Sequence, residues 1–464
     1  MTEIERSASS PVPSRSAEKQ SGYQQLLRRH YSFFVPPMVR VLQIGCGSGE
    51  LLAALQPSRG LGIDGDPKQI ELARQYHPHL EFQVMDSGGL ANDEKFDYIV
   101  VPDLLNSMPD VQDFLQQLQR YSHQRTRLVL NLFNQLWRPL VLLAQKITGK
   151  EPNLPQNWLS AWDIKNLLHL AGWEVVKTDA RILWPLRTPL VARFLNRWLA
   201  PILKPFCLTL FVVARPRPLP SYYHKYSCSV VVPARNEAGN IEAAVQRIPE
   251  MGMGTEILFV EGHSQDNTWE EIRRVAAKYP TRNIKALKQT SKGKGGAVRE
   301  AFAVATGDIL FILDADLTVP PEDLMKFYNV ACTGTADFVN GVRLVYPMEN
   351  EAMRFLNMVA NRFFSFAFSW LLGQPIKDTL CGTKVLFRSH YQLIALNRAY
   401  FGDFDPFGDF DLLFGAAKLN LRMVDLPIRY RARTYGETNI SRWKHGWLLL
   451  RMVCFAAKRL KFFA

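Results

Sequence analysis

The segment Asp308–Thr318 constrains the fold of this chain more than any other. Its apolar run, Ile309–Leu313, predicts a buried strand, and the run ends in an Asp-Ala-Asp triplet formed by Asp314, Ala315 and Asp316. Side chains two residues apart on an extended segment point to one side, so both carboxylates face the same place. Carboxylate oxygens suit Mg²⁺ and Mn²⁺. The triplet predicts a divalent-cation site, although a lone triplet of this kind also occurs as a plain polar strand end.

Three segments upstream repeat the same pattern. Residues 229–241, 256–269 and 291–307 each combine an apolar run or a glycine-rich turn with polar residues and a helical pattern. Strands that alternate with helices predict a parallel sheet, whose ligands bind beyond the carboxyl ends of the strands. A divalent cation at that edge would neutralise the charge of a leaving diphosphate. The four segments in this order predict a pocket for a nucleotide diphosphate.

From about Ser227 to Lys458 the chain resembles the family-two glycosyltransferases of GT-A fold, and among them the dolichyl-phosphate mannose synthase-like polyprenyl-phosphate sugar transferases. The sequence departs from that family's pattern at Gly262, His263 and Thr318. The resemblance implies that Asp314 and Asp316 are catalytic and hold Mg or Mn. It also implies a nucleotide-sugar site made by Pro233, Arg235, Glu237, Glu261, Asp266 and Lys294, and a D-x-x-x-G segment from Asp378 to Gly382.

The resemblance further implies an acceptor site for the phosphate of a polyprenyl phosphate. Arg343, Arg433 and Ser441 are its expected ligands, and Asp409 and Asp411 form an acidic, catalytic cluster at the start of a helix. A phosphate acceptor is already anionic near neutral pH and needs cations for positioning. A hydroxyl acceptor would instead need a carboxylate such as Asp409 or Asp411 to take its proton. Both kinds of acceptor stay open.

The N-terminal half has a glycine loop of its own. Gly45, Gly47 and Gly49 follow an apolar run, Asp64 ends a second run and Asp86 ends a third. A glycine loop with an acid about twenty residues later is also typical of dinucleotide binding. The complete order resembles a class I S-adenosylmethionine-dependent methyltransferase, in which the glycines border the methionine part. By that resemblance Asp64 binds the ribose hydroxyls and Asp86 lies near the adenine, unless the domain has lost its cofactor.

Composition and the turn-forming residues of the linker divide the chain into domains. Its 464 residues are too many for one ordinary core, and 47% hydrophobic with 21% charged residues is typical of a folded protein. The six cysteines form no C-x-x-C pair, which favours a reducing, cytoplasmic setting. We expect an α/β protein with two Rossmann-like domains and amphipathic interfacial helices. The expected parts are a disordered leader (1–25), a methyltransferase-like domain (26–215), a linker (216–226) and a GT-A domain (227–464).

Three stretches mix large apolar residues with basic ones, namely 186–206, 353–378 and 441–464. Their apolar parts are shorter than the roughly twenty residues that span a bilayer. Amphipathic, basic helices of this kind lie in the interface of anionic membranes. The net charge of +13 agrees with such a surface, and since no nucleic-acid-binding motif appears, we expect no nucleic acid partner. The expected location is peripheral, on the inner face of the cell membrane.

These observations predict a bifunctional methyltransferase/glycosyltransferase of hexosyltransferase type. It would move a sugar from a nucleotide diphosphate to a polyprenyl phosphate or another lipid-linked acceptor. The alternative is a single-activity glycosyltransferase whose N-terminal domain is a non-catalytic module for a partner or a membrane. A polysaccharide synthase is disfavoured, because the chain lacks multiple spanning segments and a Q-x-x-R-W segment. Tyr98, Asn106 and His123 are the side chains that could assist methyl transfer, and the linker predicts that the two sites work independently.

Overall fold

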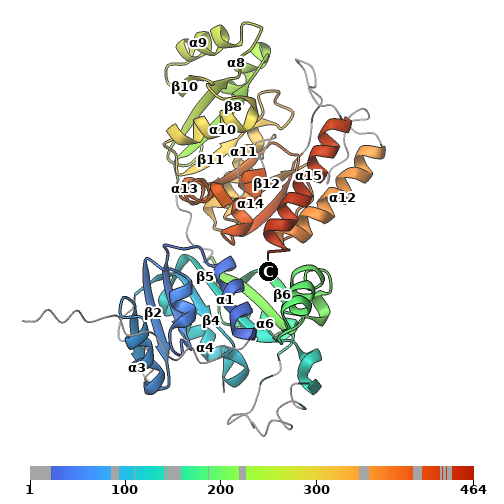
Figure 1. Cartoon of the computed structure of the whole chain (residues 1–464). Helices are drawn as coiled ribbons and strands as arrows, with labels where there is room; N and C mark the ends of the chain where they lie inside the picture. Colours follow the sequence, from blue (N-terminus) through green and yellow to red (C-terminus); the bar gives the residue numbers. More distant parts are fainter. Residues whose placement is uncertain are drawn as a thin grey trace, which may run out of the picture.

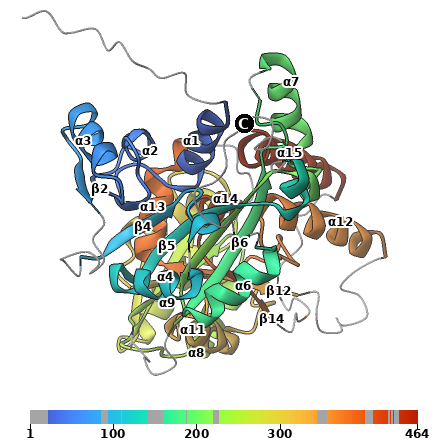
Figure 2. The ribbon, with the colours of Figure 1, turned by 90° about the horizontal axis from the view of Figure 1, so that it is seen from below.

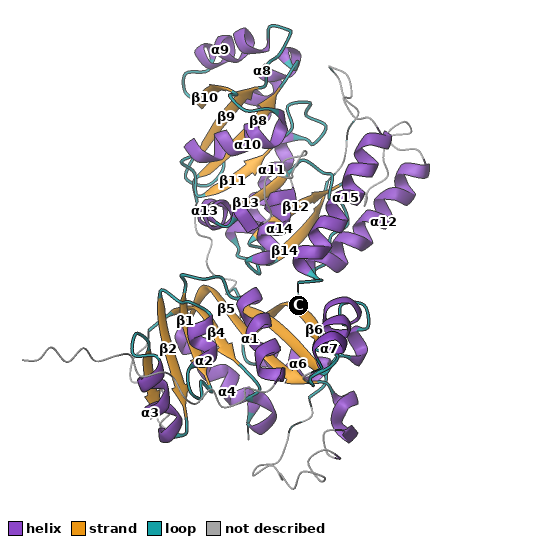
Figure 3. Cartoon of the chain, viewed as in Figure 1, coloured by secondary structure: helices purple, strands orange, loops and turns teal. Residues whose placement is uncertain are grey.

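The chain folds around two seven-stranded sheets, one in each half (Figure 1). The structure is a computed structural model. It describes residues 22–84, 94–108, 110–140, 143, 157, 159–186, 188–218, 226–343, 355–400, 410–428, 431, 435 and 442–463. Both sheets carry helices on their faces (Figure 3), so the expected α/β architecture of two Rossmann-like domains is confirmed.

The N-terminal sheet has the strand order β3-β2-β1-β4-β5-β7-β6. Strands β3, β2, β1, β4 and β5 are parallel to one another, and β7 is antiparallel to both β5 and β6. The strands are β1 (Arg40–Ile44), β2 (Arg59–Asp64), β3 (Glu81–Val84), β4 (Phe96–Val101), β5 (Ser122–Phe133), β6 (Trp173–Arg181) and β7 (Thr209–Pro216). The helices include α1 (Gly22–Phe34), α2 (Glu50–Ala54), α3 (Pro67–Tyr76), α4 (Val111–Gln117), α6 (Ala161–Leu170) and α7 (Pro189–Phe194).

The C-terminal sheet has the order β10-β9-β8-β11-β13-β12-β14, with β13 antiparallel to β11 and β12. Strands β9 and β11 are buried along their whole length, as expected of strands covered by helices on both faces. The strands are β8 (Cys228–Ala234), β9 (Thr255–Glu261), β10 (Asn283–Lys288), β11 (Ile309–Ile312), β12 (Phe338–Val342), β13 (Lys384–Phe387) and β14 (Met423–Pro427). The helices include α8 (Ile241–Arg247), α9 (Thr268–Lys278), α10 (Gly293–Val304), α11 (Leu324–Cys332), α12 (Phe355–Leu372), α13 (Arg388–Leu396), α14 (Phe410–Lys418) and α15 (Arg442–Leu460).

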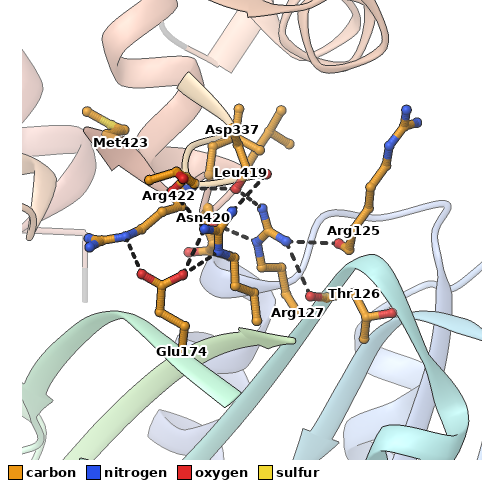
Figure 4. Close-up of polar contacts among 12 residues, drawn as sticks. Arg125, Thr126, Arg127, Glu174, Asp337, Leu419, Asn420, Arg422 and Met423 are labelled. Carbon is orange, nitrogen blue, oxygen red and sulfur yellow. Dashed lines mark hydrogen bonds and ion pairs between the residues drawn. The ribbon is translucent and has the colours of Figure 1, made fainter. Parts of the chain in front are cut away.

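The two halves meet in a buried polar interface (Figure 4). Arg127 of β5 places its Nη2 2.5 Å from Oδ2 of Asp337, and Arg215 of β7 approaches the other oxygen of that carboxylate at 3.4 Å. Glu174 of β6 accepts a hydrogen bond from Nε of Arg422 at 3.0 Å. Burial opposes ionisation of Asp337, but Arg127 and Arg215 outweigh it and lower its pKa to about 2. The interface therefore consists of paired charges, with Asp337 and Arg127 buried.

The end of the chain completes this interface. The ring of Phe463 stacks on that of Phe33 in α1 with centroids 4.0 Å apart, and Arg181 of β6 donates to the carbonyl oxygens of Leu460 and Lys461. One apolar core cluster contains buried side chains of both halves. The C-terminus lies between the two sheets (Figure 1). The linker pattern did not predict that the two halves share a core, because it marks only where the chain passes from one half to the other.

Two expectations from the sequence, on the extent of the leader and on membrane-spanning segments, can be compared with the structure. Helix α1 begins at Gly22, so residues 22–25, which we expected in the leader, are helical, and the rest of the leader lies outside the described residues. Within the described part of the chain, no helix combines the length and the apolar character needed to cross a membrane.

Candidate active sites

The Asp-Ala-Asp triplet lies directly after β11, beside residues from two other segments. The Nζ of Lys294, in the first turn of α10, is 2.6 Å from Oδ1 of Asp314. Burial opposes ionisation of Asp314, but Lys294 outweighs it and lowers the pKa of this carboxyl. A methyl group added at Gly382 would collide with Oδ2 of Asp314 and with Nζ of Lys294. Because Gly382 has no side chain, the D-x-x-x-G segment can lie close to the triplet.

Asp316 is held by its own turn. Its Oδ1 accepts hydrogen bonds from the backbone N of Thr318 at 3.1 Å and from Oγ1 of Thr318 at 2.8 Å, while Leu317 between them has a φ of 52°. This left-handed turn ends the strand and fixes the second carboxylate. Thr318, noted in the sequence as a departure from the family pattern, thus has a structural role, because it holds the carboxylate of Asp316.

The donor set suits a cation that a diphosphate helps to bind. Among the described residues there is no group of three or more His, Cys, Asp or Glu side chains that could enclose a metal by themselves. Mg²⁺ in proteins is commonly held by one or two carboxylates together with substrate phosphates and water. Asp314 and Asp316 supply two carboxylates of that kind next to one strand end, so the residues present fit such a cation.

The loops after β8 and β9 are tied to one another by the predicted nucleotide-sugar residues and their neighbours. Oδ1 of Asn236 accepts from the backbone N of Gln265 at 2.8 Å. Asp266 accepts from the backbone N of Ala238 at 3.3 Å and of Thr268 at 3.1 Å. Asp266, a predicted site residue, therefore joins the two loops through hydrogen bonds from backbone groups.

The other predicted donor residues divide into buried and exposed groups. Glu237 is buried and accepts from Nδ2 of Asn240 at 2.7 Å, and Glu261 is buried and accepts from the backbone N of Ser264. Pro233 is half-buried in β8, and Arg235 just after the strand is exposed. Of this set, Arg235 is the side chain that solvent and ligands reach most easily.

The predicted acceptor residues are only partly described. Arg343 forms a two-pronged ion pair with Asp378, with Nε to Oδ2 at 2.8 Å and Nη2 to Oδ1 at 3.0 Å. Burial raises the pKa of Asp411, whose carboxylate lies 3.2 Å from Nε of Arg398. The remaining three, Asp409, Arg433 and Ser441, lie outside the described residues.

Two described residues of the segment around Arg433, which we call the acceptor segment, contact the turns that follow β8 and β11, which we call the donor loops. The backbone N of Arg431 donates to the carbonyl O of Thr318 at 2.9 Å, so this segment passes over the turn of the triplet. The ring of Tyr435 packs so close to Gly239 that a Cβ there would lie 2.7 Å from it. A fully buried lysine, Lys384, donates from Nζ to the carbonyl O of Cys381 beside the same site. Sequence reasoning missed Lys384, because a single lysine at the start of a strand carries no motif.

In the N-terminal half the glycine loop and its acid interlock. All three glycines, Gly45, Gly47 and Gly49, have positive φ values of 73°, 51° and 82°. The backbone N of Gly47 donates to Oδ2 of Asp64 at 2.8 Å, and the backbone N of Asp66 donates to Oδ1 at 3.0 Å. The glycine loop and Asp64 are thus in direct contact, whereas Asp86 lies outside the described residues.

A buried polar cluster, which the sequence did not reveal, lies at the same edge of this sheet. Asp103 follows β4 with a φ of 51° and accepts hydrogen bonds from the hydroxyl of Tyr23 at 2.8 Å and from Nδ2 of Asn131 at 2.5 Å. The hydroxyl of Tyr31 donates to Oδ1 of Asn131 at 2.6 Å. Burial raises the pKa of Asp103. The signal was hidden, because Tyr23 and Asp103 are 80 residues apart.

The three side chains proposed from sequence as helpers of methyl transfer have structural contacts. The hydroxyl of Tyr98 donates to the carbonyl O of Leu419 across the interface, and Nδ2 of Asn106 donates to that of Asn157. Nε2 of His123 lies 3.1 Å from Oδ1 of Asp97. These contacts account for all three residues.

Comparison with known proteins separates the same two halves. Residues 229–395 match the model of glycosyl transferase family 2, and residues 14–178 match that of a methyltransferase domain. Over 218 residues the chain is 37% identical to the dolichol-phosphate mannosyltransferase of Pyrococcus furiosus, a match over 46% of this chain. The chain spans 59% of the length of that relative.

Two solved structures are similar to one half each. Glucosyl-3-phosphoglycerate synthase of Mycobacterium tuberculosis, in complex with Mn²⁺ and UDP, has a TM-score of 0.38 at 20% identity, over 51% of this chain and 80% of that one. Magnesium protoporphyrin IX methyltransferase of Synechocystis PCC 6803 has a TM-score of 0.31 at 20% identity, over 42% of this chain and 84% of that one. By its two family matches, the chain carries a methyltransferase domain followed by a family 2 glycosyltransferase domain.

Proposed function

We propose that the C-terminal half transfers a sugar from a nucleotide diphosphate to a polyprenyl phosphate, and that the N-terminal half transfers a methyl group from S-adenosylmethionine. The observation that carries the first part is the contact of the acceptor segment with the donor loops, through Arg431 on Thr318 and Tyr435 on Gly239. When the donor and acceptor sites are in contact, the sugar can pass directly from one substrate to the other. The name of the Pyrococcus relative, a dolichol-phosphate mannosyltransferase, supports the class of acceptor.

On the donor side, Asp314 and Asp316 would hold Mg or Mn together with the diphosphate. When bound, such a cation supplies positive charge that stabilises the leaving diphosphate. Lys294 keeps Asp314 ionised in the absence of the donor and lies close enough to contact a donor phosphate as well. Arg235 is exposed at the rim of the donor loops, where it would contact the nucleotide.

On the acceptor side, a phosphate needs orientation more than it needs a base. Asp378 fixes the guanidinium of Arg343 through two hydrogen bonds, and a guanidinium held in this way is suited to a phosphate. Arg433 and Ser441 complete this proposal as further phosphate ligands. The competing acceptor is a hydroxyl, whose proton Asp409 or Asp411 would take, and burial of Asp411 raises its pKa in the direction that such a base needs.

A membrane surface is the proposed location of the reaction, on the inner face of the cell membrane. The exposed side chains of Phe363 and Phe366 on α12 and of Trp447 and Leu450 on α15 are large and apolar. Basic residues follow on α15, and the segment from Arg442 onward contains no acid. This combination favours peripheral binding to anionic lipid.

The proposal is tested with the variant Asp316→Asn. Because an amide cannot supply an anionic oxygen, transfer from a panel of labelled nucleotide sugars to undecaprenyl phosphate should fall by about 100-fold or more. The matched control is Glu322→Gln, which alters an acid in an exposed ion pair with Arg247 and should keep full activity. Full activity of Asp316→Asn, or wild-type activity in EDTA, would contradict the cation site. Transfer only to hydroxyl acceptors would contradict the phosphate acceptor.

The methyl-transfer part is tested by calorimetry with S-adenosylmethionine. The link between Gly47 and Asp64 supports a preformed cofactor loop, so we expect saturable binding. Absence of binding heat together with an intact fold would favour the alternative of a non-catalytic N-terminal module.

A further inference from the structure

The cofactor edge of the methyltransferase sheet is also where two long connections leave it. Because β1, β2, β4 and β5 are parallel, their carboxyl ends share one edge with the glycine loop and Asp64. Thr209, the first residue of β7, pairs with Phe133 at the end of β5 and with Arg181 at the end of β6. The connections that follow Phe133 and Arg181 therefore begin at the cofactor edge.

These two connections expose large apolar side chains. The backbone O of Phe206 accepts a hydrogen bond from Nε1 of Trp137 at 2.8 Å, which joins the first connection to the second. Each member of this group keeps at least 56% of its surface exposed. We call the group the apolar rim; it consists of Leu136, Leu140, Leu190, Phe194, Ile202 and Phe206. Such a concentration of exposed apolar side chains marks an interaction surface.

The charge around the apolar rim identifies its partner as an anionic bilayer. The sequence contains no acid between Asp179 and Glu237, and none from Asn131 to Leu140 in the described part of the first connection. Arg138, Arg193, Arg197 and Lys204 lie among the apolar residues of these two connections. Apolar side chains that share their described segments with basic residues and with no acid match the headgroup region of anionic lipid, where each basic residue adds to binding.

The apolar rim continues into the glycosyltransferase half. Nε1 of Trp370 in α12 donates to the carbonyl O of Pro201 at 3.3 Å, and the ring of Trp198 lies 5.2 Å from that of Phe462, just after α15. Figure 2 shows α7, α12 and α15 on one side of the molecule. One bilayer can therefore contact both halves at once on this side, and α7 belongs to a connection that begins at the cofactor edge.

We propose that the methyltransferase domain methylates a lipid-anchored acceptor at the bilayer on which the glycosyltransferase works. This inference rests on the proposed methyl transfer and on the proposed membrane location of sugar transfer, and it adds the class of methyl acceptor. A lone pair of an acceptor oxygen or nitrogen forms the bond to the methyl carbon as the methyl–sulfur bond of S-adenosylmethionine breaks. The bonding electrons stay on sulfur, S-adenosylhomocysteine leaves and the acceptor proton passes to water. The acceptor is either the glycolipid made by the second domain or another membrane lipid.

The experiment supplies the full chain with tritiated-methyl S-adenosylmethionine and vesicles made from a total lipid extract of the expressing cells. A second arm adds undecaprenyl phosphate and ¹⁴C-labelled nucleotide sugars. Tritium should enter the organic phase. Dependence on the added sugar identifies the glycolipid as the acceptor, whereas sugar-independent label identifies another membrane lipid. Because sugar transfer is read by ¹⁴C, a failed glycosyltransferase assignment does not hide methylation.

A pair of variants separates docking from catalysis. Leu190→Glu combined with Phe194→Glu should lower vesicle binding and lipid methylation at least about tenfold, because each residue loses the gain from burying a large apolar side chain. Calorimetric binding of S-adenosylmethionine and the melting temperature should not change. The matched control is Met253→Glu, at an apolar residue 71% exposed in a turn of the other half. No tritium in the organic phase, or equal lipid methylation by both variants, would overturn the proposal.

Discussion

The two halves of the molecule hold their central acids in different ways. Asp64 accepts hydrogen bonds from two backbone N–H groups of nearby turns. Asp314 faces the ammonium group of Lys294, and Gly382 from a third segment closes over the pair. The first arrangement needs the backbone of two neighbouring segments, whereas the second needs side chains and a close approach from three. The glycosyltransferase site should therefore be the more sensitive of the two to small displacements.

Among the variants that test this contrast, the largest expected effect on activity is that of Gly382→Ala. Because the added methyl group would collide with Asp314 and Lys294, sugar transfer should fall by about 100-fold, the cost of a displacement of about 1 Å. Binding of S-adenosylmethionine should stay the same. The control is Gly65→Ala in the methyltransferase half, where a Cβ meets open space. Equal activity of both variants in a sugar-transfer assay would remove the contrast between the halves.

A second variant tests whether the halves are one body. Asp337→Asn leaves Arg127 and Arg215 without their shared carboxylate, and breaking a buried pair costs about 3–5 kcal/mol. Urea unfolding should show that loss, and both activities should become heat-labile together. Disruption of the exposed pair of Arg247 and Glu322 by Glu322→Gln should cost no more than about 1 kcal/mol. A loss confined to one activity would mean that the halves are energetically independent.

The cofactor acid gives a smaller effect. Asp64→Ala removes an acceptor held in place by Gly47 and should weaken S-adenosylmethionine binding by about 1–3 kcal/mol. Asp66→Ala is the comparison, because its side chain caps α3 by accepting from the backbone N of Lys68. That variant should lower the melting temperature and leave calorimetric affinity unchanged. Similar affinities of the two variants would remove Asp64 from the cofactor site.

The smallest effect concerns pH. Burial lowers the pKa of Lys177 to about 7, against the opposing charge of Asp179, and its Nζ donates to the carbonyl O of Ala417 across the interface. Since the unfolded chain binds this proton more tightly, the free energy of unfolding should rise as pH increases above about 7. Between about pH 7 and 8 the gain from one such group is about 1 kcal/mol or less. Lys177→Met should flatten that rise in denaturant titrations, and an unchanged slope would contradict the burial of a charged lysine.

The sequence allowed prediction of both sheets and of the acids at their strand ends, because each depends on local patterns. The run Ile309–Leu313 and the glycines before Asp64 carry that information within a few residues. The interface does not, because Arg127 and Asp337 are 210 residues apart and Glu174 and Arg422 are 248 apart. Each of these four looks like an ordinary charged residue beside a strand. Their pairing depends on how the two domains pack against each other, which no local sequence pattern encodes.

The buried contact of α1 with the chain end has a consequence for the order of folding. Arg29 and Phe463, which share a hydrogen bond, are separated by 434 residues, and loop closure over such a distance is entropically costly until each domain has formed. The interface should therefore assemble last, after both sheets. Until then Phe33, Phe34 and the apolar end of α15 face water, so slow steps and aggregation should concentrate at this stage of refolding.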